Sequence, residues 1–292
     1  MKKLSKLYWI VSAVVTIAGL SVMTVSAVQI NKKNQQSQPV TASDFCKAED
    51  LHSVEIAVSY ADIQIAPAGN GQVSLTLPDD TFTYTCENGI LKIQNQQNTG
   101  FFGVQFIDFG IVQQEKKITL SLPEQQYETI TLSSGTGDMN LSGISAGTLT
   151  ASVGTGDINL QSCTLSGMNI DSGTGSIRLN GSEIQSVSDI DLGTGDFNAE
   201  SCTLSGIDID SGTGNITMQD SVLLGNADID CGTGDITMML SGTIQDYQVD
   251  CSECIGDIRI QNDSAKSMNS VSAQYRLKAD TVGDVEISFT AP

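Results

Sequence analysis

A short motif, Gly-Thr-Gly followed by Asp, Asn or Ser, recurs along the middle of the chain at a nearly fixed interval. The copies start 19 or 20 residues apart, at Gly135, Gly154, Gly173, Gly193, Gly212 and Gly232. Degenerate copies follow at 254–257 and 281–284, and an earlier echo lies at 60–65. A fixed period of this length is typical of repeat architectures, in which each copy stacks on its neighbours.

The residues on both sides of the motif alternate between apolar and polar. Ile207-Asp208-Ile209-Asp210 precedes one copy, and Asp235-Ile236-Thr237-Met238 continues another. A period of two indicates strands rather than helices. Roughly 20 residues at about 3.3 Å each give a perimeter near 65 Å, enough for two or three short faces, and such coils stack about 4.8 Å apart. We therefore predict an all-β fold, a single-stranded parallel β-solenoid with about 19–20 residues per coil.

The interior of this solenoid should be filled by one apolar set from the alternating segments. We expect these side chains to point inward: Ile158, Leu160, Ile170, Ile177, Leu179, Ile190, Ile207, Ile209, Ile216, Met218, Ile229, Ile236 and Met238. The Gly-Thr-Gly corner supplies positive φ and close backbone approach, which glycine adopts at little cost. It is no phosphate loop, because it lacks a following Lys and leads into a strand.

The two ends of a solenoid expose unpaired strand edges and need caps. We expect an N-terminal β cap at 44–130, the repeat solenoid at 131–260 and C-terminal cap strands at 261–292, with closing strands at 271–289. Strands of the first cap are expected at 54–65, 73–77, 82–86, 90–93 and 118–122. The apolar, aromatic segment 100–112 either packs over the open end of the coil or contacts a membrane or partner.

The N-terminus carries an export signal. Lys2, Lys3 and Lys6 precede an apolar run from Leu7 to Val28, which has the length of a membrane helix. The basic flank keeps that end in the cytoplasm, so the rest of the chain should face outward. We predict a signal anchor or transmembrane helix at 1–28, followed by a flexible polar linker at 29–43. The alternative is cleavage after Ala27, which ends a run of small residues.

Acidic side chains dominate the repeats. The net charge is −20, and Arg178 is the one basic residue between Ile118 and Asp257. This excess argues against nucleic acid, whose phosphates need Lys and Arg. Stacking would align the acids in rows. The candidate binding residues are Asp171, Asp191, Asp210 and Asp230, two residues before a motif; Asp189, Asp208 and Asp228, four before; and Asp157, Asp196 and Asp235, which follow it.

Three explanations of these rows remain open. Carboxylates about 5 Å apart repel by roughly 1 kcal/mol in water. Calcium would relieve the repulsion, since it takes clustered carboxylate oxygens. A cationic peptide would also relieve it. The third explanation is a solvated face that resists aggregation, with the Asp after the motif bonded to its own turn. We predict no other cofactor.

The cysteines number seven, and the histidine is single. Cys163 and Cys202 occupy equivalent places two coils apart, so they should be buried and unpaired. Cys46 with Cys86, and Cys231 with Cys251, are candidate disulfides. Cys251-x-x-Cys254 is weak as a zinc or redox site because no second pair accompanies it. His52 has no nucleophile motif around it, so we expect an exposed or half-buried strand residue.

At these residues the chain resembles a known family. The repeated Gly-Thr-Gly-Asp-Ile, the segment 58–63 and the lead-in 118–123 are similar to the bacterial putative-adhesin β-strand-repeat family, domain of unknown function 4097. The resemblance covers roughly 54–289. It implies a solenoid-like fold and an envelope location, and some relatives belong to envelope-stress systems that respond to cationic peptides. The family has no agreed catalytic residues, so none is carried over.

Together these patterns predict a protein that binds rather than catalyses. We expect an extracytoplasmic, membrane-anchored surface protein whose acidic face binds or senses cationic peptides or envelope components. An adhesin or structural surface module is the alternative. A polysaccharide lyase fits less well, because Arg178 is the one candidate basic residue within the coils and no aromatic subsites flank it.

Overall fold

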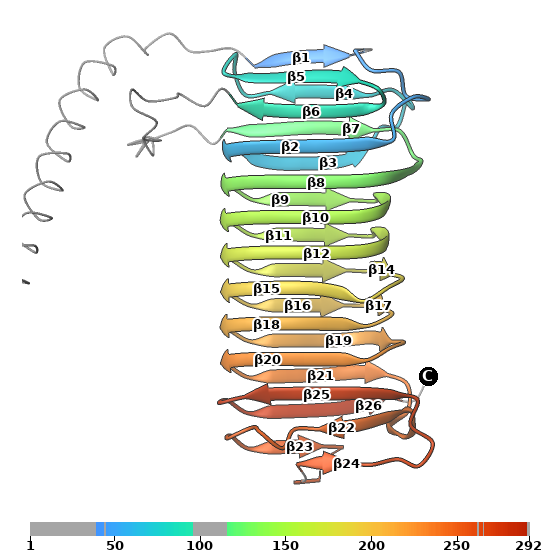
Figure 1. Ribbon diagram of the computed structural model, residues 1–292, viewed down its shortest axis with the longest axis vertical. Helices are drawn as coiled ribbons and strands as arrows, with labels where there is room; N and C mark the ends of the chain where they lie inside the picture. Colours follow the sequence, from blue (N-terminus) through green and yellow to red (C-terminus); the bar gives the residue numbers. More distant parts are fainter. Residues whose placement is uncertain (1–38, 44, 96–115, 262, 265, 291–292) are drawn as a thin grey trace, which may run out of the picture. The chain divides into compact units, whose positions relative to one another are not determined.

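The computed structural model describes residues 39–43, 45–95, 116–261, 263–264 and 266–290 (Figure 1). The described residues group as one compact unit. None of the described segments forms a helix with the length and hydropathy that a bilayer crossing requires. The predicted anchor at 1–28 and the aromatic segment 100–112 lie outside the described residues.

Strands make up most of the described chain, with one 3-10 turn. The first nine are β1 (Val40–Ser43), β2 (Ser53–Tyr60), β3 (Asp62–Pro67), β4 (Ser74–Leu77), β5 (Phe82–Glu87), β6 (Ile90–Asn95), β7 (Lys117–Leu122), β8 (Gln126–Thr136) and β9 (Met139–Ser142). The repeats continue with β10 (Ser145–Thr155), β11 (Ile158–Gln161), β12 (Thr164–Thr174), β13 (Ile177–Asn180), β14 (Glu183–Ile184), β15 (Ser188–Thr194), β16 (Phe197–Glu200), β17 (Thr203–Leu204), β18 (Ile207–Thr213) and β19 (Ile216–Leu223). The last are β20 (Ala227–Thr233), β21 (Ile236–Ser241), η1 (Ile244–Asp246), β22 (Tyr247–Asp250), β23 (Ile258–Ile260), β24 (Ser267–Met268), β25 (Tyr275–Thr281) and β26 (Val285–Thr290).

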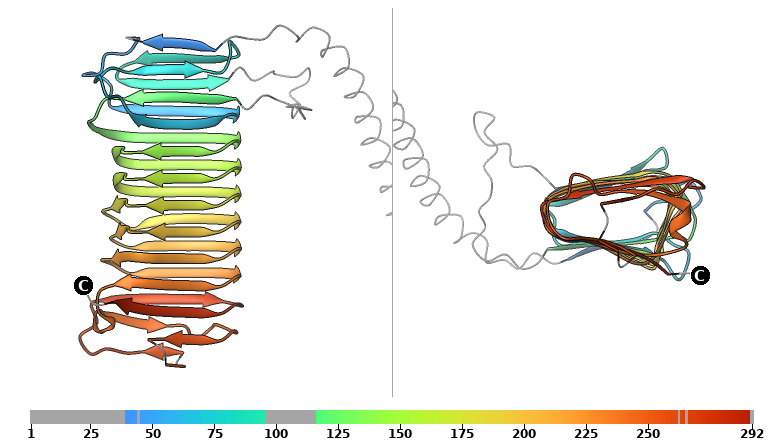
Figure 2. Two further views of the ribbon diagram at one scale, coloured as in Figure 1. Left: turned by 180° about the vertical axis from the view of Figure 1, so that it is seen from behind. Right: turned by 90° about the horizontal axis from the view of Figure 1, so that it is seen from below.

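Each repeat is one coil that contributes one strand to each of two facing sheets. We call these sheet A and sheet B. In the coil of β12 and β13, the long strand β12 belongs to sheet B and the short strand β13 to sheet A. Equivalent residues of successive coils pair in parallel, as Ile158 pairs with Ile177 and Ile177 with Phe197. Seen along its axis, the stack is a flattened tube (Figure 2). The prediction of a parallel solenoid with one repeat per coil is confirmed.

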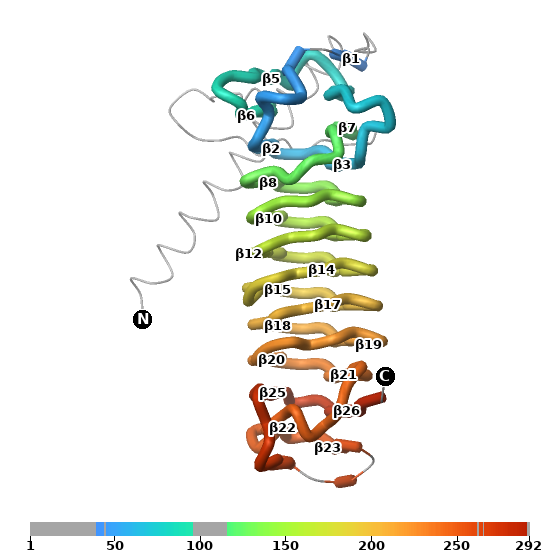
Figure 3. Tube along the Cα trace, turned by 90° about the vertical axis from the view of Figure 1, so that its right-hand side faces the viewer, coloured from blue at the N-terminus to red at the C-terminus, as the bar shows by residue number. Residues whose placement is uncertain are grey.

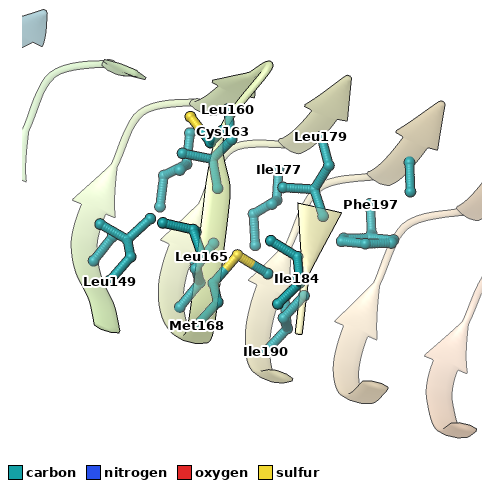
Figure 4. Close-up of a cluster of buried hydrophobic side chains, with 14 of the residues drawn as sticks. Leu149, Leu160, Cys163, Leu165, Met168, Ile177, Leu179, Ile184, Ile190 and Phe197 are labelled. Atoms are coloured by element: carbon teal, nitrogen blue, oxygen red, sulfur yellow. The ribbon is translucent and has the colours of Figure 1, made fainter. Parts of the chain in front are cut away.

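The core is the space between the two sheets. All thirteen side chains predicted to point inward are at most 2 % exposed. Figure 4 shows part of this core, which further side chains complete: Leu149, Met168 and Ile190 from sheet B face Ile177 and Phe197 from sheet A. Because the side chains alternate along each strand, the polar residues between them face outward. One apolar column therefore runs through all the coils.

The Gly-Thr-Gly corner needs glycine for two reasons. The last glycine of each motif has positive φ, as at Gly214 with φ of 142°. A Cβ there would lie 1.8 Å from the carbonyl oxygen of Gly195 in the preceding coil. Both the backbone conformation and the close approach of the coils therefore exclude a side chain.

The order of coils in space departs from the order in sequence at both ends. The β2–β3 coil lies between the β6–β7 layer and the β8–β9 coil. The β25–β26 coil lies between the β20–β21 coil and the β22–β23 layer. Figures 1 and 3 show both insertions, at the blue and red ends of the stack. The outermost coil at the C-terminal end is therefore formed by β22 and β23 rather than by the last strands.

The N-terminal end is closed by antiparallel strands. β5 pairs with β6, and β1 pairs with β4, which pairs with β7. Part of the predicted linker thus forms a strand, β1, rather than a flexible tether. A disulfide joins Cys46 to Cys86 with a Cα–Cα distance of 5.7 Å, so that predicted pairing is confirmed. The largely buried ion pair between Lys116 and Asp79, 2.7 Å long, also stabilises this end.

The remaining cysteines are free and buried. Cys163 and Cys202 behave as predicted. The candidate pairing of Cys231 with Cys251 is not formed, because it assumed that the two residues lie on adjacent coils. Cys231 pairs in register with Thr281 of β25, and β25 separates β20 from β22.

Candidate functional site

The outer face of sheet B carries two parallel rows of carboxylates. In one row Asp189, Asp208 and Asp228 are direct neighbours on successive coils. The second row lies two residues further along each strand. Between the rows the alternating isoleucines point into the core, which forces the aspartates outward. We call the seven exposed residues the acidic patch: Asp171, Asp189, Asp191, Asp208, Asp210, Asp228 and Asp230.

The acids of this patch act on one another electrostatically. Partial burial raises the pKa of Asp191, and the charges of Asp189, Asp210 and Asp171 raise it further. Partial burial and the charges of Asp228, Asp189, Asp191 and Asp210 likewise raise the pKa of Asp208. Asp191 and Asp208 are therefore harder to ionise than isolated carboxylates. A cation placed over the patch would relieve this repulsion.

The patch has a defined start and end along the axis. Towards the N-terminus its two rows continue as neutral residues, such as Thr150 and Ser152. Towards the C-terminus the next residue in register with Asp228 is Lys278. Its ammonium lies 3.6 Å from Asp228 Oδ1 and 2.5 Å from Asp280 Oδ2. The hydrogen bond to Asp280 raises the pKa of Lys278, so this end of the patch is closed by a stable positive charge.

The other three candidate acids have a structural role at the corner. The side-chain oxygen of Asp157 accepts the backbone N–H of Ser176 at 2.8 Å, and Asp196 accepts that of Asn215 at 2.8 Å. Asp235 accepts the N–H of Asp284 at 2.9 Å. These bonds join neighbouring coils rather than closing each residue's own turn. We call the whole series the corner ladder: Asp62, Asp138, Asp157, Ser176, Asp196, Asn215, Asp235, Asp284 and Asp257.

Arg178 belongs to this corner as well. It lies on β13 of sheet A, and its guanidinium is 2.6 Å from Asp157 Oδ2. Partial burial acts to raise the pKa of Asp157, but the Ser176 N–H and the Arg178 charge lower it below its ordinary value. Arg178 is thus paired on the other sheet and does not face the acidic patch. The geometry offers no support for it as the basic residue of a lyase.

Sheet A presents a contrasting outer face. Its central outward row contains Asn140, Asn159, Arg178, Asn198, Thr217 and Thr237. Asn159 donates to Asn140 at 3.0 Å, so the amides form a short ladder. Over these six coils the row carries one charge, that of Arg178, whereas the patch on sheet B carries seven acids over four coils. The two rows of outward aspartates therefore lie on sheet B alone.

His52 lies beside the first coil and away from the acidic patch. Its Nδ1 is 3.3 Å from Glu128, and its Nε2 is 3.1 Å from the Asn88 carbonyl. The side chain is 42 % exposed, as expected for a half-buried residue. Over the residues that the structure describes, no group of three or more His, Cys, Asp or Glu side chains is arranged to hold a metal ion.

Two residues at the edge of the patch were not identified from the sequence. Lys278 and Asp280 were not candidates, because the chain order places them beyond the repeats. A weak signal was present, since Asp280 comes directly before the degenerate motif at 281–284 and Asp230 lies two residues before its own motif. The insertion of β25 beside β20 brings them to the patch.

A family model matches residues 51–290, which includes both inserted coils and the whole corner ladder. The chain belongs to the Toastrack DUF4097 family. This confirms the resemblance seen in the repeats. No curated protein matches this Toastrack chain at a significant level.

Solved structures show weaker likenesses. A putative adhesin from Bacteroides fragilis is 16 % identical, with a TM-score of 0.46, over 85 % of this chain and 96 % of its own. A putative cell adhesion protein from Clostridium sporogenes is 8 % identical, with a TM-score of 0.28, over 87 % and 100 %. A putative lipid binding protein from Parabacteroides distasonis is 13 % identical, with a TM-score of 0.27, over 87 % and 96 %. Likenesses at this level say nothing about what this Toastrack chain binds.

Proposed function

We propose that this Toastrack chain is a non-enzymatic surface module that binds cationic peptides through the acidic patch. The observation that carries the proposal is the concentration of seven exposed aspartates on four successive coils of one sheet. Partial burial, and after it the repulsion among these charges, raises the pKa of Asp191 and Asp208. A ligand with several positive charges would gain from each carboxylate that it neutralises.

The geometry favours a linear cation over a metal ion. The rows follow the solenoid axis with a spacing of about 4.8 Å per coil, so no single ion reaches more than a few of them. Calcium requires six to eight oxygens around one point. The exposed wall instead offers a line of single carboxylates. An extended peptide rich in lysine or arginine would place its charges along this line.

The location of the module belongs to the same proposal. The basic N-terminus and the apolar run at 7–28 support export, with the solenoid outside the membrane. In that setting the patch would meet cationic peptides or envelope proteins. An adhesin or structural module that holds another macromolecule is the alternative. It predicts binding that does not depend on the patch.

Isothermal titration of the full chain with an oligolysine peptide tests the proposal. The variant Asp191→Asn/Asp208→Asn/Asp210→Asn removes three central charges. The matched control, Glu87→Gln/Glu124→Gln/Asp220→Asn, removes three exposed charges elsewhere. We expect the patch variant to bind at least about tenfold more weakly at about 0.1 M salt, and the control to change little.

Three outcomes would contradict this assignment. Equal loss in both variants would mean that only the overall charge attracts the peptide. Saturable binding of calcium, but not magnesium, that the patch variant abolishes would identify a metal site instead. Binding of envelope macromolecules that the patch variant leaves intact would favour the adhesin alternative.

A further inference from the structure

Two cysteines lie at the two ends of one turn in the outermost coil of the C-terminal end. Cys251 directly follows β22, and Cys254 lies three residues later. The backbone N–H of Cys254 donates to the Cys251 carbonyl at 3.3 Å, which closes a four-residue turn. Such a turn holds its first and last Cα atoms within about 7 Å. A disulfide needs Cα atoms about 4.4–6.8 Å apart, so the backbone already has a suitable geometry.

The side chains of this turn share one buried environment. Cys251 is 0 % exposed and Cys254 is 2 % exposed. Each thiol contributes to the pKa of the other, so the two side chains are electrostatic neighbours. The Cys254 thiol also donates to the Ala279 carbonyl of the inserted strand β25 at 2.9 Å. The pair is thus packed against the coil that it covers.

The other free cysteines are arranged differently. Cys163, Cys202 and Cys231 lie on separate coils, and each thiol donates to a backbone carbonyl, at 3.5, 3.2 and 3.2 Å respectively. These three behave as small apolar residues of the core. Of the five free cysteines, only Cys251 and Cys254 share a turn.

We propose that Cys251 and Cys254 are a site of reversible disulfide formation, which fastens the outer coil in the presence of a small-molecule disulfide. The Cys254 sulfur, as a thiolate, attacks one sulfur of the small disulfide and releases one small thiol. The Cys251 sulfur then attacks the mixed disulfide at Cys254 and releases the second small thiol. Two electrons pass from the protein to the oxidant, and the two protons of the cysteines end on the released thiols.

The surroundings determine when this exchange occurs. Burial raises the pKa of Cys251 to about 12. Burial also raises the pKa of Cys254, although the nearby positive charge of Lys266 opposes part of that rise. Lys266 holds the turn through its backbone and side chain, at 2.8 and 3.0 Å. Both thiols therefore stay protonated while the turn is closed, and Cys254 is the better first nucleophile once the turn opens.

The sequence allows a direct test, because Glu253 lies between the two cysteines. The full chain is incubated, folded, in glutathione buffers from fully reduced to fully oxidised. It is then quenched in acid, and free thiols are alkylated. A protease specific for glutamate cuts after Glu253, giving fragments 201–253 and 254–286. We expect the oxidised protein to keep these fragments linked until a reductant is added, and the reduced protein to release them.

Variants assign the linkage within the fragments. Cys251→Ser and Cys254→Ser should each abolish it. Cys202→Ala and Cys231→Ala are matched controls, because both residues lie in the same fragment as Cys251, and they should leave it intact. The proposal is overturned if the folded wild-type chain never shows linked fragments in oxidised buffer. It is also overturned if the linkage survives Cys251→Ser, or appears only after unfolding in urea.

Discussion

The backbone N–H of Asn215 donates to the side chain of Asp196 at 2.8 Å, across the gap between two coils. The same bond recurs along the corner ladder, and in two of its places Ser176 or Asn215 replaces aspartate. What these residues share is an acceptor oxygen rather than a charge. The ladder therefore explains the residue after Gly-Thr-Gly as a hydrogen-bond acceptor for the next coil.

We expect Asp196→Ala to lower the free energy of unfolding by about 1 kcal/mol, because the Asn215 N–H loses its partner. Asp196→Asn keeps the acceptor oxygen and should leave stability close to that of the wild type. Urea unfolding followed by circular dichroism measures both variants. Equal losses would show that the charge of Asp196, and not its hydrogen bond, matters.

A second prediction concerns the corner glycines. Gly214→Ala should destabilise the solenoid by about 3 kcal/mol or more, since it combines positive φ with a severe backbone clash. Gly242 has a similar φ of 140°, but a Cβ there would meet no atom within 4 Å. Gly242→Ala should therefore cost about 1–2 kcal/mol, for the backbone conformation alone. Thermal melts of the two variants would separate the two causes, and equal shifts would contradict the role given to the close approach of the coils.

The pH dependence of the acidic patch follows from its raised pKa values. Because Asp191 and Asp208 bind protons more tightly when folded, their ionisation destabilises the folded chain. This penalty is present at pH 7, and it disappears as the pH falls through the raised values towards the ordinary 3.8. Asp191→Asn/Asp208→Asn should therefore raise the melting temperature relative to the wild type at pH 7, with a gain that shrinks to nothing near pH 3. A gain that is constant with pH would point to a cause other than charge.

The N-terminal disulfide offers a further test. Cys46 and Cys86 close a loop with a sequence separation of 40 residues. Replacing both with serine should lower the free energy of unfolding by about 3–4 kcal/mol. The measurement is urea unfolding of the variant beside the wild type without reductant. Addition of reductant should remove most of the difference, and a persisting gap would assign the loss to packing rather than to the cross-link.

The repeats were predictable because one local pattern fixes them. The period of Gly-Thr-Gly sets the coil length, and the alternation around it separates inward residues such as Ile177 from outward ones such as Asp191. Strand direction and register follow, since each coil can stack only with its equivalent positions aligned. The acidic patch was therefore visible in the sequence as two phased rows.

The ends were not predictable in the same way. The packing of whole coils decides which strand covers the last repeat, and no local sequence pattern predicts that choice. Cys231 and Cys251 were expected on adjacent coils, and that expectation was wrong for this reason. The order of the strands along the chain does not indicate that β25 lies between β20 and β22. One interpretation of the sequence assigned Asp157 a hydrogen bond to its own turn, whereas its partner is Ser176 of the next coil. The presence of Ser and Asn at equivalent positions was a signal that an acceptor, rather than a charge, is needed there.

The insertion of β25 and β26 has a mechanical consequence. A terminal coil at the open end of a stack can peel away by breaking one hydrogen-bond ladder at a time. Here β26 pairs with β21 on one side and β23 on the other, and β25 pairs with β20 and β22. A pull at Thr290 must therefore load two ladders together before the coil can leave. The C-terminal end of this solenoid should therefore resist a higher pulling force than a terminal coil that is paired on one side only.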